Sequence, residues 1–395
     1  MNPLREQIRR QLRAMVGITV GSVGAFSGLC VWNGNEDFYR NYVMPLASNL
    51  DPETSHKLAI IAMRHCLIRN QPQKDPETLD TKLWDITFSN PIGIAAGFDK
   101  HAEAMQGLHR TGFGFVEIGS VTPQPQEGNS KPRVFRLIED EAIINRYGFN
   151  SEGHEVVLER VKAEIKKEDR AIIGVNLGKN KLSSSAVEDY VAGVKKFGPV
   201  ADYLVINVSS PNTPGLRALQ QKSELEDLIG HVVEARNKLE LAKRPPLLLK
   251  VAPDLNDQEK EDIASVVLQE RCRVDGIIVT NTTVSRPANL RSRHKEEVGG
   301  LSGLPLKDMS TQCVRDFYRL TGGRIPIIGV GGVASGQDAF DKIQAGASLV
   351  QLYSSFAFQG PPVVRRIKRE LDDLLKLHGY RNVAEAVGKS CINNK

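Results

Sequence analysis

The sequence has few cysteines, and none of the five has the spacing of a metal ligand or a disulfide partner. Cys30, Cys66, Cys272, Cys313 and Cys391 are scattered along the 395 residues. This scatter argues against a zinc site and against a disulfide framework. It is typical of small buried apolar side chains, and we expect no bound metal.

Long basic runs and nucleotide-binding signatures are also missing. The formal net charge is +5, and no long Lys/Arg run lies within residues 77–395, which disfavours nucleic acid as a partner. No strand-Gly-x-Gly-x-x-Gly-helix unit and no Gly-x4-Gly-Lys-Ser/Thr motif occurs, so neither a Rossmann site nor a nucleoside triphosphate loop is expected. The hydrophobic share of 41% is ordinary for a globular enzyme.

Charge is absent from residues 14–32, directly after a start that carries four arginines and one acid. A helix over these residues would span roughly 28 Å, close to the thickness of a bilayer core. The pattern predicts a mitochondrial targeting leader over 1–13 and a retained transmembrane helix over 14–32, with the arginines on the matrix side. A cleaved secretory signal is the alternative, but no clear small-x-small cleavage site precedes Glu36 and Asp37.

Residues 35–69 read as two short helices. Asn35 can cap the first helix, and Asp51-Pro52 is a good start for the second. Phe38, Tyr42 and Leu46 recur every four residues and would share one face of the first helix. Such a pair either covers a barrel end as ordinary core or forms an apolar mouth on a membrane that admits a lipophilic molecule. The polar residues 70–80, with two prolines, read as a linker.

Eight short apolar runs, each ending in Gly, Asn, Lys, Ser or Thr, dominate the rest of the chain. They are Ile92–Gly97, Phe115–Val121, Ile172–Gly178, Tyr203–Ser210, Leu247–Pro253, Gly276–Thr282, Ile327–Gly332 and Leu349–Ser355. Eight buried strands with helical patterns between most of them predict an α/β fold, a (β/α)8 barrel over residues 77–395. Such a barrel keeps its chemistry at the C-terminal ends of its strands, where the polar residues gather.

The seventh and eighth runs end in residues suited to a phosphate. Gly329-Val-Gly-Gly332 closes the seventh run and Tyr353-Ser354-Ser355 closes the eighth. In barrels, the loops after these two strands often hold a phosphate through backbone N–H groups, and glycines allow the backbone to approach closely.

Two lysines and five asparagines mark other strand ends. Lys250 lies inside an apolar run, where an ammonium is costly unless it meets an anionic ligand or a core acid. Lys100 follows the first run. An ammonium at such a place would stabilise the negative charge that a flavin gains on reduction. The asparagines, whose amides suit a planar ring rich in C=O and N–H, are Asn145, Asn176, Asn207, Asn212 and Asn281.

No histidine lies at a predicted strand end, so the candidate base is a serine. Ser209-Ser210-Pro211-Asn212 closes the fourth run and opens a loop that could act as a lid. A serine takes a proton only if its site shifts its basicity or relays the proton onward.

Together, six ordered motifs resemble class 2 dihydroorotate dehydrogenase, the quinone-dependent mitochondrial form, over almost the whole chain. They are Ala95-Ala-Gly-Phe-Asp-Lys100, Asn145-Arg-Tyr-Gly-Phe-Asn150, Gly174-Val-Asn-Leu-Gly178, Ile206-Asn-Val-Ser-Ser-Pro-Asn212, Val279-Thr-Asn-Thr282 and Gly329-Val-Gly-Gly332. Class 1 relatives use a cysteine as base, whereas the matching position here is Ser210.

The resemblance implies an FMN-dependent oxidation of dihydroorotate to orotate in pyrimidine (UMP) biosynthesis, with Ser210 as base and ubiquinone as final acceptor. It implies an inner mitochondrial membrane protein with its barrel in the intermembrane space. The residues implied to hold the substrate are Lys100, Asn145, Arg146, Tyr147, Gly148, Phe149, Asn207, Asn212, Asn281 and Thr282. Those implied to hold FMN are Ala95, Ala96, Gly97, Ser120, Asn176, Asn207, Lys250, Thr280, Gly303, Gly332, Tyr353 and Ser354. His56, Arg136 and Tyr353 match residues of the quinone path.

Two other functions stay open at this point. A membrane-tethered barrel could bind a phosphate ligand without redox chemistry, although Lys250 and the asparagines disfavour it. A 2-hydroxy acid oxidase would share the phosphate site, but such enzymes use a histidine base near a strand end.

Overall fold

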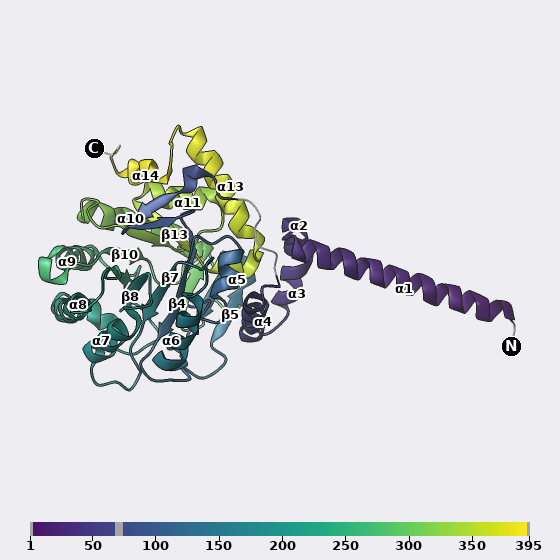
Figure 1. The fold of residues 1–395 in the computed structure, drawn as a ribbon, viewed down its shortest axis with the longest axis horizontal. Helices are drawn as coiled ribbons and strands as arrows, with labels where there is room; N and C mark the ends of the chain where they lie inside the picture. The colour runs from purple at the N-terminus through teal and green to yellow at the C-terminus, as the bar shows by residue number, and fades with distance from the viewer. Residues whose placement is uncertain (1–2, 68–73, 393–395) are drawn as a thin grey trace.

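The computed structural model describes residues 3–67 and 74–392, and its centre is a closed barrel of eight parallel strands (Figure 1). The strands pair in the order β10-β12-β13-β3-β4-β7-β8-β9, which closes on itself. Their bounds are β3 (Ile92–Ile94), β4 (Phe115–Val121), β7 (Ile173–Leu177), β8 (Tyr203–Asn207), β9 (Leu247–Val251), β10 (Gly276–Val279), β12 (Ile327–Val330) and β13 (Ala347–Leu352). Each predicted run overlaps one of these strands, and the predicted (β/α)8 barrel is confirmed.

Helices surround the barrel, and side chains cap the starts of three of those described. Ser185 and Ser335 cap α7 and α11, and Asn256 forms a capping box with Glu259 at the start of α9. The surrounding helices are α5 (Met105–Arg110), α6 (Gly153–Glu164), α7 (Ala186–Phe197), α8 (Lys222–Asn237), α9 (Asp257–Leu268), α10 (Lys307–Leu320), α11 (Gly336–Gln344), α12 (Ser354–Gln359) and α13 (Pro362–Leu377). The short α14 (Val383–Ala386) and α15 (Lys389–Ile392) follow.

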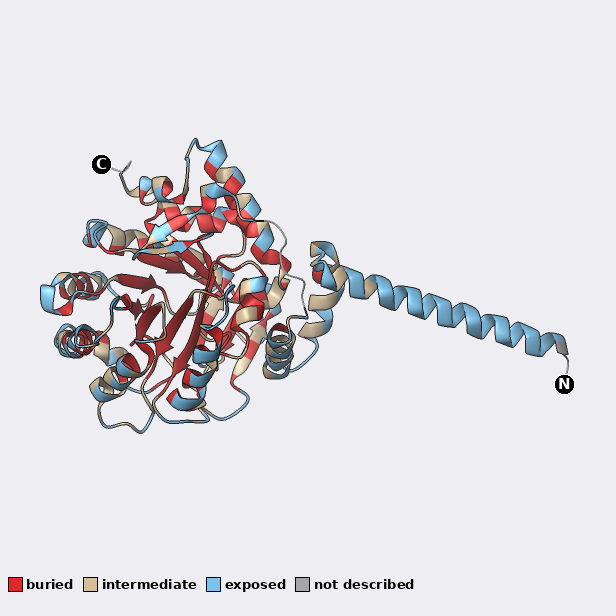
Figure 2. Cartoon of the chain, viewed as in Figure 1, coloured by how far each residue is buried: buried red, intermediate tan, exposed pale blue. Residues whose placement is uncertain are grey.

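Large side chains fill the barrel interior, which is the most deeply buried part of the molecule (Figure 2). Phe88, Phe115 and Tyr203 are fully buried there. Gly174 makes room for one of these rings, because a Cβ on it would lie 2.0 Å from the Tyr203 ring. Phe88 comes from a hairpin of β1 (Thr81–Leu83) and β2 (Ile86–Phe88), which the pattern of eight runs does not indicate.

A three-stranded antiparallel sheet lies outside the barrel ladder and was also not predicted. It consists of β5 (Val134–Leu137), β6 (Ala142–Asn145) and β11 (Gly300–Gly303), in the order β11-β6-β5. Gly300 pairs with Asn145, so strands about 150 residues apart in sequence lie side by side. The sheet places Asn145 beside Gly300 at one end of the pair and Gly303 beside Ala142 at the other.

The N-terminal helix α1 (Pro3–Trp32) extends away from the barrel and is exposed along its length (Figures 1 and 2). Residues Leu4–Trp32 are long and apolar enough to cross a membrane, judged by length and composition. The predicted leader and span form one helix here. Residues 1–2 of the leader and 393–395 of the predicted barrel domain lie outside the described residues.

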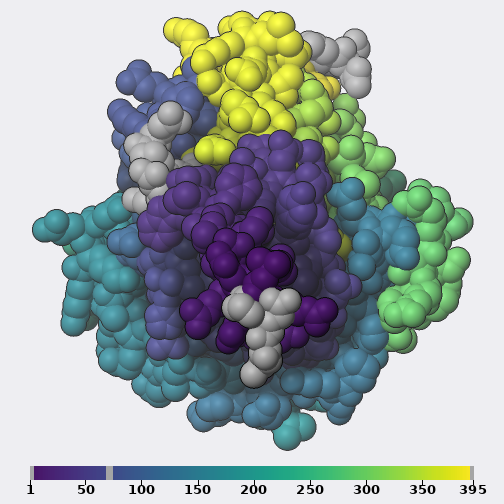
Figure 3. Space-filling view, turned by 90° about the vertical axis from the view of Figure 1, so that its right-hand side faces the viewer, coloured from purple at the N-terminus to yellow at the C-terminus, as the bar shows by residue number. Residues whose placement is uncertain are grey.

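The segment after α1 covers one side of the barrel, as the purple surface in Figure 3 shows. Its first predicted helix consists of three pieces, namely α2 (Glu36–Phe38), a π-helical turn over Tyr39–Val43 and α3 (Met44–Ser48). The second is α4 (Pro52–Arg64). Asn35 accepts a hydrogen bond from the Phe38 N–H (2.8 Å), and Asp51 accepts one from the Thr54 N–H (2.9 Å). Residues 68–69 of this segment and 70–73 of the linker lie outside the described residues.

Candidate active site

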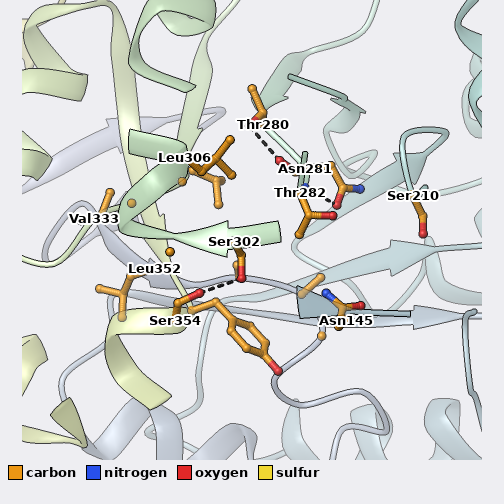
Figure 4. Close-up of a pocket in the computed structure, with 18 of the residues that line it drawn as sticks. Asn145, Ser210, Thr280, Asn281, Thr282, Ser302, Leu306, Val333, Leu352 and Ser354 are labelled. Carbon is orange, nitrogen blue, oxygen red and sulfur yellow. Dashed lines mark hydrogen bonds between the residues drawn. The ribbon is translucent and has the colours of Figure 1, made fainter. Parts of the chain in front are cut away.

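A polar cavity of about 150 Å³ opens at the C-terminal ends of the barrel strands (Figure 4). It is lined by all the residues that the resemblance assigned to substrate or FMN except Arg146, Asn176 and Asn207. Ser210 also lines it, and in Figure 4 Ser210 and Asn145 lie at one end while Leu352 and Val333 lie at the other.

Asn176 and Asn207 support the cavity through hydrogen bonds. Asn207 Nδ2 donates to Ser120 Oγ (2.9 Å) and to Asn176 Oδ1 (3.2 Å). Asn281 Nδ2 donates in turn to Asn207 Oδ1 (3.1 Å). These bonds hold the side-chain amides in defined positions, so the predicted convergence of asparagines is present in the structure.

Two further asparagines, Asn145 and Asn212, are hydrogen-bonded to each other. Asn212 Nδ2 donates to Asn145 Oδ1 (3.2 Å), which joins the loop after β8 to the end of β6. Arg146, the next residue, turns away from the cavity. Its guanidinium donates to Glu297 Oε2 (2.7 Å) and to the Val298 carbonyl (3.1 Å), so the structure does not bring this side chain to the predicted substrate site.

Lys250 meets a core acid and lines the cavity as well. Its ammonium lies 3.4 Å from Glu117 Oε1, and both side chains are buried. Glu117 also accepts hydrogen bonds from Asn176 Nδ2 (2.9 Å) and Gln351 Nε2 (2.6 Å). The two partners considered for Lys250 are therefore compatible. Glu117 was not predicted, although an acid inside the apolar run Phe115–Val121 was an available signal.

Lys100 has no carboxylate partner in the described part of the chain. Its ammonium lies 3.9 Å from the centre of the Tyr147 ring. Burial, with a smaller contribution from Arg133, lowers the pKa of Lys100 to about 7. A bound anion would favour the charged form, so this lysine is suited to meet the carboxylate of a ligand.

Ser210 lies at the start of the loop after β8, and Arg217 holds the backbone of the residue before it. The Asn212 N–H donates to Ser210 Oγ (3.3 Å). Arg217 donates to the Ser209 carbonyl (3.1 Å) and the Thr282 carbonyl (2.9 Å), and it pairs with Asp254 (2.8 Å). One guanidinium therefore connects the loops after β8, β9 and β10, which sequence reasoning did not foresee.

The other end of the cavity consists of closely approaching backbone. Gly331 and Gly332 have positive φ angles, and a Cβ on Gly332 would lie 2.5 Å from Lys307 Cβ. The Ser302 and Ser354 hydroxyls are 2.8 Å apart here (Figure 4). Ser302 and Leu306 were not predicted, because they come from β11 and the turn after it.

A second, mostly apolar cavity of about 380 Å³ lies between the N-terminal helices and the barrel. Its lining includes His56, Arg136 and Tyr353, the three residues assigned to the quinone path. Val31, at the end of α1, also lines it. Asn145, Tyr147 and Tyr353 line both cavities, so the polar and the apolar cavity share a wall.

Two polar side chains of this second cavity, His56 and Arg136, form hydrogen bonds with the protein itself. His56 Nε2 donates to the Phe98 carbonyl (2.7 Å), and burial lowers the pKa of His56 to about 4, which keeps the ring neutral at pH 7. Arg136 donates to the carbonyls of Ala47 (3.1 Å) and Leu50 (2.9 Å). These bonds fasten the N-terminal helices to the barrel.

The fold and this pair of cavities define a (β/α)8-barrel enzyme whose strand ends carry a polar binding site. The profile of the family described as dihydroorotate dehydrogenase matches residues 78–375. The chain is 54% identical to "Dihydroorotate dehydrogenase (quinone), mitochondrial" of Mus musculus over 389 residues, which are 96% of this chain and 98% of the mouse protein. It is 52% identical to "Dihydroorotate dehydrogenase (quinone)" of Xanthobacter autotrophicus over 347 residues, which cover 87% and 97% of the two chains.

Solved structures agree with these sequence matches. A crystal structure of DHODH from Eimeria tenella in complex with ferulenol superposes with a TM-score of 0.84 at 44% identity and covers 89% of this chain and 99% of its own. This chain belongs to the dihydroorotate dehydrogenase family, and among its members it is similar to the quinone-dependent, mitochondrial ones. It is an oxidoreductase, which decides against the phosphate-binding barrel without redox chemistry. Membership of this family decides against the 2-hydroxy acid oxidase.

Proposed function

We propose that this protein oxidises dihydroorotate to orotate with FMN as hydride acceptor and ubiquinone as final electron acceptor, in pyrimidine biosynthesis. The observation that carries the proposal is a pair of cavities, one rich in polar side chains and one more apolar, that share Asn145, Tyr147 and Tyr353. A polar substrate and a lipophilic acceptor need different surroundings, and a cofactor between them would exchange electrons with each in turn.

The residues of the polar cavity fit FMN. Gly331 and Gly332 leave room for close approach of a phosphate, the Ser354 hydroxyl can donate to it, and Lys250 offers a cation at the other side. When bound, FMN supplies a ring that accepts hydride and releases electrons singly or in pairs. The full set that would hold it comprises Ala95, Ala96, Gly97, Ser120, Asn176, Asn207, Lys250, Thr280, Gly303, Gly332, Tyr353 and Ser354.

The substrate would be held by the lysine and the amides at the other end of the cavity. Lys100 would pair with its carboxylate, since this half-buried ammonium forms no ion pair with an acid of the described chain. Asn145, Asn212 and Asn281 would bond the C=O and N–H groups of its ring. Ser210 would take the C5 proton, and the clamp by Arg217 would keep this serine in position.

Ubiquinone would enter the apolar cavity. Tyr353, which lines both cavities, lies where electrons would cross from the flavin to the quinone. His56, neutral at pH 7, and Arg136 are the polar groups of this path. Burial lowers the pKa of Arg136. A guanidinium is nevertheless among the most basic groups of a protein, so Arg136 would carry its charge to a quinone oxygen or to the reduced quinone.

The N-terminal region would place this cavity at the membrane. Residues 14–32 of α1 would span the inner mitochondrial membrane once, the arginine-rich residues 1–13 would stay on the matrix side, and residues 35–69 would form the quinone entrance. Residues 77–395 would then form the FMN-binding barrel in the intermembrane space. Tyr42 and Leu46, 65% and 71% exposed, present an apolar face beside the end of α1 that a lipid surface would cover.

The proposal is tested by one anaerobic experiment on the full chain in detergent. The visible spectrum is recorded, dihydroorotate is added, and then a short-chain ubiquinone is added. We expect a flavin spectrum that bleaches with dihydroorotate and returns with quinone. A return with fumarate or NAD but not with quinone would overturn the acceptor, and folded protein that takes up no flavin would overturn the cofactor.

A further inference from the structure

One fully buried lysine, Lys342, lies behind the polar cavity, on the helix that follows β12. Lys342 of α11 is 0% exposed. Its ammonium donates to Ser310 Oγ (2.8 Å) and Thr311 Oγ1 (3.0 Å), both on the neighbouring helix α10. Within residues 3–67 and 74–392 it forms no ion pair, whereas the buried Lys250 and Lys368 each have a carboxylate partner.

Each of the two hydroxyls in turn donates to a backbone carbonyl, one at the end of β12 and one at the start of α10. Ser310 Oγ donates to the carbonyl of Val330, the last residue of β12. Thr311 Oγ1 donates to the carbonyl of Lys307 (2.8 Å), the first residue of α10. Lys342 of α11 is therefore bonded to two hydroxyls of α10, one of which reaches the end of β12 and the other the start of α10 itself.

These two segments form the end of the polar cavity that we assign to the phosphate. Val330, Gly331 and Gly332 follow one another along its lining, and Leu306 lines it from the other segment. The segments touch, because a Cβ on Gly332 would lie 2.5 Å from Lys307 Cβ, and one on Gly331 would lie 2.8 Å from Ser310 Cβ. A small shift of either segment would move the backbone N–H groups that face the cavity.

A buried ammonium with only hydroxyl acceptors is costly for the fold, and burial lowers the pKa of Lys342 to about 7. An anion on the cavity side of the same segments would offset that cost across a medium of low dielectric constant. A phosphate dianion is the strongest such anion that the proposed cofactor offers.

We propose that Lys342 is a positioning residue for the phosphate of FMN: through Ser310 and Thr311 it holds Gly331–Gly332 and the start of α10 in register, and its charge favours the dianion from behind. This inference rests on the proposed binding of FMN. It predicts an effect on the phosphate alone and not on the flavin ring.

The test compares FMN with riboflavin, which has the same ring and no phosphate. Flavin is removed from the full chain in detergent, and each ligand is titrated back while its fluorescence quenching is followed. In Lys342→Met we expect the preference for FMN over riboflavin to fall by about tenfold, because the charge behind the phosphate and the bonds that position the backbone around it would both be lost. Ser310→Ala should lower the preference in the same direction by a smaller factor.

Lys368→Met is the matched control. Lys368 is also a buried lysine on a helix, but it pairs with Asp75 at 2.6 Å and does not line the cavity. We expect its preference for FMN to equal that of the wild type, whatever its stability. If Lys342→Met does not fold, the same titration of Ser310→Ala decides.

An unchanged preference in Lys342→Met, whether both affinities fall equally or neither falls, would overturn the inference alone, provided that the wild type prefers FMN to riboflavin. Wild-type protein that binds FMN no better than riboflavin would overturn the proposed phosphate site, and the role of Lys342 with it. The two failures are therefore distinguishable in one set of titrations.

Discussion

The two cavities differ in how their walls are built. The polar cavity lies on strand ends whose spacing the barrel imposes. Asn207 bonds Asn176 and Asn281 at 3.2 and 3.1 Å and Ser120 at 2.9 Å. The apolar cavity has one wall from the barrel side and one from α3 and α4, which are fastened by a few contacts such as Arg133–Glu53 (2.9 Å) and His56–Phe98 (2.7 Å). A rigid polar site and a separately attached apolar one can therefore be changed one at a time.

The largest expected effect isolates the polar cavity. We expect Ser210→Ala to slow flavin reduction by dihydroorotate by about 10²–10⁴-fold near pH 7, the usual contribution of a positioned base. Stopped-flow absorbance of the flavin measures this step. Because Ser210 does not line the apolar cavity, reoxidation of the pre-reduced variant by quinone should keep its wild-type rate. Near-normal reduction would remove Ser210 from its role.

A second change tests charge pairing in the polar cavity. We expect Lys100→Met to weaken orotate binding by about 10–100-fold, because the carboxylate would lose a charge-assisted hydrogen bond in a buried site. Isothermal calorimetry with the product avoids turnover. Unchanged affinity would show that the carboxylate binds elsewhere.

The lowered pKa of Lys100 also predicts the direction in which orotate affinity changes with pH. Its pKa is lowered from 10.5 to about 7, so the ammonium that would bind orotate is present below about pH 7 and is lost as the pH rises through that value. Wild-type affinity for orotate should therefore fall above about pH 7, and Lys100→Met should remove that fall. The stability of the ligand-free protein should change in the opposite direction. Between about pH 7 and 10.5 the unfolded chain binds this proton and the folded chain does not, so the contribution of Lys100 to the free energy of unfolding rises with pH over that range.

The smallest effect is expected in the apolar cavity, from a pair of truncations. Deletion of residues 1–33 removes the proposed span but keeps α3 and α4, and the truncated protein should keep FMN and both half-reactions. Deletion of residues 1–70 removes one cavity wall. Its kcat/KM for a short-chain ubiquinone should fall by about tenfold, because one face of the apolar pocket is lost. Reduction by dihydroorotate serves as the control for folding.

Either truncation can contradict the claim that the two cavities are independent of each other. Unchanged quinone kinetics after deletion of 1–70 would show that the apolar cavity is not the entrance. Loss of FMN after deletion of 1–33 would show that α1 belongs to the fold of the barrel.

The parts of the fold that depend on local pattern could be predicted. Each of the eight runs is a strand, because strands of a parallel barrel are buried on both faces and read as continuous apolar stretches. The caps Asn35 and Asp51 were also readable, since a cap is a contact across three residues. The π-helical turn over Tyr39–Val43 was not readable, and the regular spacing of Phe38, Tyr42 and Leu46 concealed it.

Site residues that follow a barrel strand could be predicted from the sequence, whereas residues that a distant segment brings to the site could not. Lys100, Ser210 and Asn281 follow barrel strands and line the cavity as expected. Ser302 reaches it only because β11 pairs with β6, and Arg146 leaves it only because Glu297 lies nearby. Neither pairing has a signal in the sequence around it.

By itself the sequence determined the barrel, the position of its polar site, the apolar N-terminal helix and the family, because these follow from periodicity and from ordered motifs. Only the tertiary structure decided that Glu117 neutralises Lys250, that Lys100 and Lys342 have no acid in the described chain, and that Tyr353 borders both cavities. The reason is physical: the charge state and neighbours of a buried group depend on segments far away in sequence, which only the closed fold brings within a few ångströms.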